Sequence, residues 1–105
     1  LDKVHSAYFI GIGGIGMSAL ARYFIDNKIQ VFGYDKTSSD ITNALEKDGI
    51  DIHFEDQVDL IPKEITAYKN NCLIVYTPAI PKDNQEFVFL TENDVALFKR
   101  SEVLG

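Results

Sequence analysis

Apolar residues along this chain alternate between two spacings, and the alternation predicts strands that are each followed by a helix. Residues 6–12, SAYFIGI, form a continuous apolar run, as in strands that are buried on both faces of a sheet. From Gly14 onward the apolar residues recur at the spacing of an amphipathic helix, which we expect to end near Asn27. The chain therefore opens with a strand that leads directly into a helix.

The same order repeats along the rest of the chain. Further strands are predicted at residues 29–35, 50–54, 72–77 and 95–98. Further helices are predicted at residues 37–49 and 84–91, with one helical turn at 59–61 and a helix start at 99–105. The first of these helices has Ser38, Ser39 and Asp40 as candidate N-caps and Gly49 as its stop. The polar segment 62–71 has no predicted element.

Strands that alternate with helices indicate right-handed crossovers and a parallel sheet with helices on both faces. We expect an α/β fold, an open, doubly wound, Rossmann-like sheet of about five strands. With 105 residues the chain is long enough for one hydrophobic core and too short for two. Residues 1–105 are therefore predicted to form a single domain.

The charge of the chain argues against polyanionic partners. Sixteen acidic residues against ten basic ones give a net charge of −6, which repels nucleic acid and an anionic membrane surface. The charge is uneven, since no Asp or Glu occurs from residue 4 to residue 25. An anion could therefore approach the start of the first helix without repulsion.

Cysteine content and hydropathy indicate the compartment. Cys72 is the only cysteine, so the chain cannot form an internal disulfide, and a reducing, cytoplasmic location is favoured. Its apolar neighbours indicate a buried core residue rather than a reactive thiol. No apolar run reaches the length of a transmembrane span, and no signal-peptide pattern opens the chain. We therefore expect no membrane partner.

The candidate chemistry lies where the first strand meets the first helix. Gly11, Gly13 and Gly16 fit the pattern G-x-G-x-x-G. The first glycine allows a tight turn, the second lets ligand oxygens reach the backbone, and the third lets the helix pack close to the strand. Amide groups of the first helical turn would then bind a diphosphate, each adding roughly 0.3 to 1 kcal/mol. The alternative is that the glycines serve only turn geometry and packing.

A second feature supports nucleotide binding. Asp35 ends the second predicted strand 19 residues after Gly16, near the spacing at which an acidic side chain binds a ribose hydroxyl. A solvated cap of the following loop is the alternative role for this carboxylate. Together the glycines and Asp35 predict a nucleotide diphosphate and leave its base open, because NAD fits as well as a nucleotide sugar.

Four segments resemble the amino-terminal domain of the Mur ligases, and within that family the UDP-N-acetylmuramate:L-alanine ligases. They are FIGIGGIGMSALA at residues 9–21, VFGYD at 31–35, VYTPAI at 75–80 and RSEVLG at 100–105. The resemblance extends over residues 8–104 and implies a domain that binds the UDP part of UDP-N-acetylmuramate in peptidoglycan biosynthesis. The residues that it implies at the substrate are Gly11, Ile12, Gly13, Gly14, Ile15, Gly16, Met17, Ser18, Asp35, Thr77, Pro78, Ala79 and Ile80.

The resemblance also implies what lies outside this chain. In the family, ATP and Mg²⁺ bind to a central domain with a G-x-x-G-K-T loop, and the amino acid binds to a third domain. The only Lys-Ser/Thr pair here, Lys36-Thr37, lacks the preceding glycines. We therefore expect a fragment of a larger cytoplasmic ligase, inactive alone, whose partners are UDP-N-acetylmuramate and the other domains. No residue of the chain is predicted to be catalytic or to bind a cofactor or metal.

The chain departs from the family pattern at two places. Thr77-Pro78 stands where the family often has two serines, and Asp56 stands near the position of a frequent His beside the nucleotide. An inward-pointing acid would repel phosphate, so Asp56 is excluded from the predicted site. His5 and His53 are interpreted as surface or core histidines and not as substitutes.

Two other functions fit parts of the sequence. A regulatory NAD-binding module without catalysis would satisfy the glycine loop and Asp35, but it leaves the segments TPAI and RSEVL unexplained. A ligase that attaches recycled peptides to the same sugar is the third interpretation, and its loop usually departs from GIGGIGMS.

Overall fold

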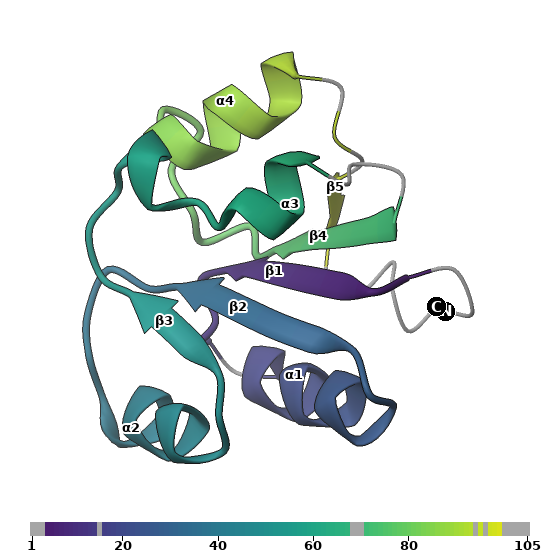
Figure 1. Ribbon diagram of the computed structural model, residues 1–105. Helices are drawn as coiled ribbons and strands as arrows, with labels where there is room; N and C mark the ends of the chain where they lie inside the picture. The colour runs from purple at the N-terminus through teal and green to yellow at the C-terminus, as the bar shows by residue number, and fades with distance from the viewer. Residues whose placement is uncertain (1–3, 15, 68–70, 94, 96, 100–105) are drawn as a thin grey trace.

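The computed structural model describes residues 4–14, 16–67, 71–93, 95 and 97–99, and within them one parallel sheet of five strands. The strands are β1 (Ser6–Ile10), β2 (Gln30–Tyr34), β3 (Asp51–His53), β4 (Cys72–Tyr76) and β5 (Leu97–Lys99). Their order in the sheet is β3-β2-β1-β4-β5, so the winding reverses between β1 and β4 (Figure 1). The predicted open, doubly wound α/β fold is confirmed.

Helices cover both faces of the sheet. Helices α1 (Met17–Asp26) and α2 (Asp40–Lys47) lie below the sheet in Figure 1, and α3 (Lys63–Ala67) and α4 (Gln85–Glu92) lie above it. The side chains of β1 alternate between the two layers. Ala7 and Phe9 belong to the core beside α1, whereas Tyr8 and Ile10 belong to the core beside α3 and α4. All four are fully buried, so β1 is the centre of the domain.

Local signals set the helix boundaries. Ser39 is the N-cap of α2, because its hydroxyl accepts the amide hydrogen of Thr42 while Thr42 Oγ1 accepts that of Ser39. Gly49 follows the end of α2 with a φ of +97°, a conformation that favours glycine. Asn84 caps α4, since its Oδ1 accepts the amide hydrogen of Phe87 at 2.9 Å. The predicted helical turn before Pro62 is present as the 3₁₀ helix η1 (Val58–Leu60).

Two predictions for the middle and the start of the chain were wrong. The segment 62–71, for which no element was predicted, contains α3. Ile65 is the one buried side chain of this five-residue helix, and one apolar position defines no period. β1 ends at Ile10 instead of residue 12, because Gly11 has a φ of +91° and leaves the extended conformation.

The end of the described chain also differs from the prediction. β5 begins at Leu97 instead of residue 95, and it includes Lys99, where a helix start was predicted. The rest of that predicted helix, residues 100–105, lies outside the described part of the chain.

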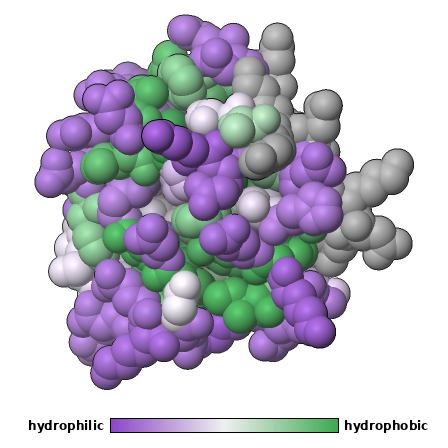
Figure 2. Space-filling view, viewed as in Figure 1, coloured by the Kyte–Doolittle hydropathy of each residue, from purple (hydrophilic) through white to green (hydrophobic). Residues whose placement is uncertain are grey.

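The predicted core position of Cys72 is confirmed. Cys72 is buried, and its thiol donates to a backbone carbonyl of α3 at 3.3 Å. Burial raises the pKa of this thiol, which therefore is not a reactive thiolate. Figure 2 shows hydrophilic side chains over much of one face, with smaller hydrophobic areas between them. Among the described residues, no helix has the length and apolar character needed to cross a membrane.

Candidate functional site

The glycine loop leaves the carboxyl end of β1 and enters α1. The amide groups of Gly11 and Ile12 donate to the carbonyl oxygen of Tyr34 at 2.8 and 3.0 Å, which ties the loop to the end of β2. The amide of Gly14 donates to the carbonyl of Gly11 at 3.0 Å and closes the turn. Gly11 and Gly16, at the two ends of the loop, have φ angles of +91° and +82°. This conformation favours glycine at both positions.

Close packing adds a second requirement for glycine at the base of the loop. A Cβ atom on Gly11 would lie 2.7 Å from Cγ2 of Thr77, and one on Gly33 would lie 2.5 Å from Cδ1 of Ile12. Both distances are shorter than packed side chains tolerate. Ile12 is fully buried against β2, so its side chain belongs to the core and not to a ligand surface.

Asp35 joins the glycine loop to the loop that precedes α2. One carboxylate oxygen accepts the amide hydrogen of Gly13 at 2.8 Å, and the other accepts that of Thr37 at 3.0 Å. A Cβ atom on Gly13 would lie 2.8 Å from this carboxylate and 3.1 Å from Cγ2 of Thr42. The second glycine of the motif therefore makes room for Asp35. The contact of Asp35 with a ribose stays a prediction.

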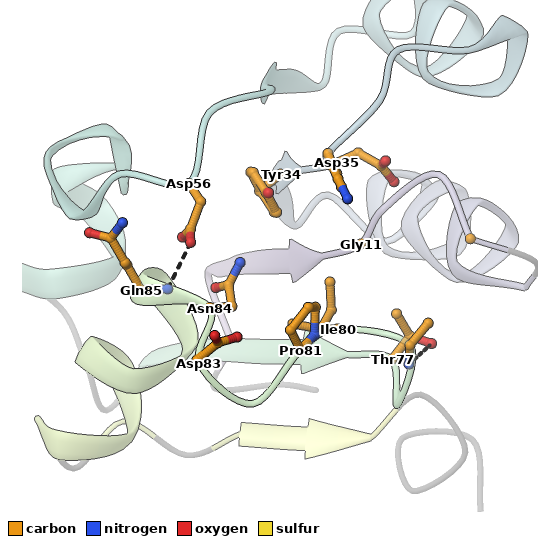
Figure 3. A pocket seen from close by; sticks show the side chains of 13 residues that line it. Gly11, Tyr34, Asp35, Asp56, Thr77, Ile80, Pro81, Asp83, Asn84 and Gln85 are labelled. Carbon is orange, nitrogen blue, oxygen red and sulfur yellow. Dashed lines mark hydrogen bonds between the residues drawn. The ribbon is translucent and has the colours of Figure 1, made fainter.

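A pocket of about 570 Å³ opens at the carboxyl ends of β1, β2 and β4 (Figure 3). It lies where the strand order reverses, the place at which open α/β sheets bind their ligands. The end of β2 forms one side, and the loop between β4 and α4 forms the other (Figure 3). The lining residues are Gly11, Gly14, Tyr34, Asp35, Lys36, Asp56, Thr77, Ala79, Ile80, Pro81, Asp83, Asn84 and Gln85.

The pocket brings together part of the predicted substrate site. Gly11, Gly14, Asp35, Thr77, Ala79 and Ile80 line it. The side chains of Ile12 and Met17 are buried in the core beside α1, so these residues could contribute only backbone groups. Gly13, Gly16, Ser18 and Pro78 also lie outside the lining. Ile15 lies outside the described residues.

The pocket has a further wall that the sequence did not reveal, formed by Asp56 and the start of α4. The two carboxylate oxygens of Asp56 accept the amide hydrogens of Gln85 and Glu86, at 2.8 and 3.0 Å (Figure 3). Asp56 therefore lies on the pocket wall, although it was excluded from the predicted site. The available signal was the DNQE segment at residues 83–86, which begins a helix shortly after the carboxyl end of a strand.

Behind this wall, the side chain of Glu86 is fully buried and binds three groups. Its carboxylate accepts hydrogen bonds from the Tyr8 hydroxyl, from Nε2 of His53 at 2.8 Å and from the amide of Gln57 at 3.2 Å. Because a carboxylate only accepts, Nε2 of His53 carries the hydrogen in this contact. His53 is thus a partnered, half-buried histidine, and His5 is a surface one.

The tyrosines around this carboxylate are held in their protonated form. Burial, followed by the charge of Glu86, raises the pKa of Tyr8 well above its usual range. Burial also raises the pKa of Tyr34, and the charges of Asp56, Glu86 and Asp35 add to that effect. The hydroxyl of Tyr34, a pocket residue, therefore remains available as a hydrogen-bond donor.

Fold and site together define a Rossmann-like α/β domain with a glycine loop and a pocket at the reversal of its sheet. A sequence model described as "Mur ligase family, catalytic domain" matches residues 6–105. The chain therefore belongs to the Mur ligase family, as its motifs predicted.

Individual relatives agree with this assignment. Over 105 residues the chain is 55% identical to UDP-N-acetylmuramate–L-alanine ligase of Cytophaga hutchinsonii. The match covers 100% of this chain and 22% of that protein. The same-named ligase of Flavobacterium psychrophilum is 52% identical over 105 residues, 23% of its length. The chain thus spans about a fifth of these relatives.

Solved structures share the fold. UDP-N-acetylmuramate–alanine ligase from Thermotoga maritima superimposes with a TM-score of 0.81 at 31% identity, covering 94% of this chain and 21% of that one. UDP-N-acetylmuramate:L-alanyl-gamma-D-glutamyl-meso-diaminopimelate ligase from Neisseria meningitides gives a TM-score of 0.78 at 18% identity, covering 96% and 30%. The second likeness concerns the fold alone.

Proposed function

We propose that this chain is the substrate-binding domain of an ATP-dependent UDP-N-acetylmuramate:L-alanine ligase of peptidoglycan biosynthesis. The proposal rests on family membership and on the names of the relatives at 55% and 52% identity. The single structural observation that carries the binding role is the glycine loop, which opens into a pocket at the reversal of the sheet. The domain would bind the UDP part of UDP-N-acetylmuramate there.

The diphosphate would bind at Gly14 and at the first turn of α1. The first amide groups of a helix lack partners within the helix and carry partial positive charge. The first turn of α1 contains no acidic residue, and its N-cap residue, Gly16, makes no side-chain hydrogen bond. Lys36 lines the same pocket and adds a positive charge. The amides of Gly13 and Gly14 would not take part themselves, because the Asp35 carboxylate and the Gly11 carbonyl oxygen already accept their hydrogens.

The role of this domain in the parent enzyme would be positional. The ligase would join the lactyl carboxylate of the substrate to the amine of alanine, with ATP and Mg²⁺ bound by other domains. Holding the distant UDP group would fix where that carboxylate lies, and fixed orientation lowers the entropic part of the barrier. We nominate no catalytic residue in this chain.

A regulatory NAD-binding module is the second candidate. The observation that favours it is Asp35, which follows β2 as the ribose-binding acid of dinucleotide-binding domains does. Both oxygens of this carboxylate, however, already accept backbone amide hydrogens, which gives Asp35 a structural role without any ribose.

Amide NMR titration of the chain with UDP-N-acetylmuramate, UDP and NAD separates these two functions. The ligase proposal predicts that both uridine nucleotides shift the amide signals of Gly14, Gly16, Asp35 and Thr77, whereas NAD has little effect. Saturation by NAD at micromolar concentration, with no response to UDP, would overturn it.

Substitution of Gly14 tests the loop more directly than substitution of Gly13. Valine at Gly13 would collide with Asp35 and Thr42 and disturb the fold itself. At Gly14 an added Cβ would lie 3.2 Å from the Gly11 carbonyl oxygen and 3.5 Å from Cγ of Met17, which small shifts accommodate. Gly14→Ala should weaken UDP binding about tenfold, a loss of about 1.4 kcal/mol. Unchanged affinity with an intact spectrum would count against the loop as the diphosphate site.

A further inference from the structure

Two helix N-termini lie near the pocket, and they reach it differently. The start of α4 lines it directly with Asn84 and Gln85 (Figure 3), whereas α1 begins behind the glycine loop, whose residues Gly11 and Gly14 form the lining. Each N-terminus presents backbone amides and the positive end of a helix dipole, so each could in principle attract a phosphate group. A ligand that carries phosphates could therefore enter this pocket in two opposite directions.

Side chains of the protein already occupy the amides of α4. Asp56 binds those of Gln85 and Glu86 at 2.8 and 3.0 Å, and Oδ1 of Asn84 binds that of Phe87 at 2.9 Å. The first turn of α4 also contains the acidic residue Glu86, whose buried carboxylate lies beside the same helix end. The positive end of α4 is thus compensated by two negative charges.

We propose that Asp56 is a specificity-determining residue, whose carboxylate occupies the anion-binding end of α4 and restricts the phosphate groups of the ligand to the glycine loop at α1. The proposal deepens the function proposed above and rests on it. The uncharged part of the ligand, with its O–H and N–H donors, would then face α4, where the carboxylates of Asp56 and Asp83 line the pocket as acceptors.

Hydrogen bonds of the Glu86 side chain fix the position of Asp56. Its partner Glu86 is held by the Tyr8 hydroxyl from β1, by His53 from β3 and by the amide of Gln57, so the start of α4 is fixed against the sheet. Asp56 itself belongs to the segment between His53 and Gln57, which the same carboxylate anchors at both ends. The contact of Asp56 with the start of α4 is therefore connected to the hydrogen bonds of the buried Glu86 carboxylate.

The charges around the pocket agree with this division. Asp35 lines the pocket near the glycine loop, where its negative charge is offset by the neighbouring cation. Lys36, the cation among the described lining residues, follows Asp35 directly. Asp83 precedes the start of α4 and adds to the negative charge at that end. A phosphate group is favoured at α1 and opposed at α4.

The test is an amide NMR titration with inorganic pyrophosphate, which has no base or sugar to bias its direction. In the unmodified chain, pyrophosphate should shift the signals of Gly14 and Gly16, while those of Gln85 and Glu86 stay unchanged. In Asp56→Ala the amide signals of Gln85 and Glu86 should shift with pyrophosphate and reach saturation. The pyrophosphate concentration needed should be at least tenfold lower than any concentration at which these signals shift in the unmodified chain. Asp83→Ala removes the same charge from the same pocket without freeing an amide, and it should leave Gln85 and Glu86 unresponsive.

The outcomes separate this proposal from the function on which it rests. If Gln85 and Glu86 shift with pyrophosphate in the unmodified chain, Asp56 does not exclude anions and the proposal is wrong. That measurement needs no variant, so it decides the matter even if Asp56→Ala fails to fold. An equal response of the Asp83→Ala variant would show that only net charge matters, which also overturns the role of Asp56. If the glycine loop fails to respond to UDP, it is the proposed function that fails.

Discussion

The glycine loop that leads into α1 and the start of α4 line one pocket, and the two helix starts differ in their caps and in their acidic residues. The first turn of α1 has no acidic residue, and Gly16 before it offers no side-chain cap. The first turn of α4 has the cap of Asn84, the buried acid Glu86 and the carboxylate of Asp56 on its amides. Backbone amides are common to both helix ends. The two helix starts therefore differ in how many of their amides side chains already bind, and those at the start of α4 are bound by Asp56 and Asn84.

The first way to test the comparison is to disturb the base of the α1 loop with Gly11→Ala. Alanine would have to adopt a φ of +91°, with its Cβ 2.7 Å from Cγ2 of Thr77. Backbone strain and overpacking together should cost about 2 to 5 kcal/mol of unfolding free energy in urea denaturation. Gly49→Ala is the matched control, because its φ is +97° and nothing lies within 4 Å of the added Cβ. It should lose only about 1 to 2 kcal/mol, and equal losses would contradict the packing argument.

The second test removes the charge that anchors α4. In Glu86→Gln an amide NH₂ replaces one of the oxygens that accept from Tyr8, His53 and Gln57, so at least one of these donors loses its acceptor. We expect a loss of about 1 to 3 kcal/mol in urea unfolding. Glu46→Gln, at an exposed position of α2, serves as the control and should change stability by less than about 0.5 kcal/mol. If both variants behave alike, the buried network does not hold the α4 end.

The third test uses pH. The pKa of Tyr8 is raised above its usual value of 10.0 in the folded state, so its contribution to stability is complete below pH 10.0 and declines as the pH rises further. Above that pH the unfolded chain loses this proton while the folded chain keeps it, which costs at most about 1.4 kcal/mol per pH unit. Tyr8→Phe should therefore show a shallower decline in urea midpoint between pH 10 and 11 than the unmodified chain. Parallel declines would mean that the surroundings of Tyr8 do not raise its pKa.

The smallest expected effect concerns the caps themselves. Asn84→Ala removes the acceptor for the amide of Phe87 and should cost about 1 kcal/mol of unfolding free energy. Ser18→Ala, in the first turn of the uncapped helix α1, should change stability by less than about 0.5 kcal/mol. A similar loss in both variants would show that α1 is stabilised by a side chain after all.

Much of the fold could be predicted from local sequence. The alternation of apolar runs with helical spacing predicted all five strands and the longer helices, because burial on a strand or a helix face imposes its own period. Gly11 and Gly16 marked the loop, since their positive φ angles favour glycine. The five-residue helix α3 was missed because Ile65 is its one buried residue, and a single apolar position shows no helical period.

The candidate site was predictable only in part. The glycine loop could be found because its residues are adjacent in the chain. Ile12 and Met17 were assigned to the site because the family resemblance implied them, and the fold packs their side chains into the core. Asp56 was excluded because a carboxylate near phosphate is unfavourable, but it lies on the wall with its charge directed at α4. Sequence alone does not indicate which way a side chain points.

The amino-acid sequence by itself determined the order of strands and helices, the glycine turn between β1 and α1, and the family to which the chain belongs. These properties depend on neighbouring residues and on local backbone geometry. Only the tertiary structure decided that the Asp56 carboxylate binds the amides at the start of α4. Asp56 and Gln85 are 29 positions apart, and they meet only because parallel strands bring the loops at their carboxyl ends to one edge of the sheet.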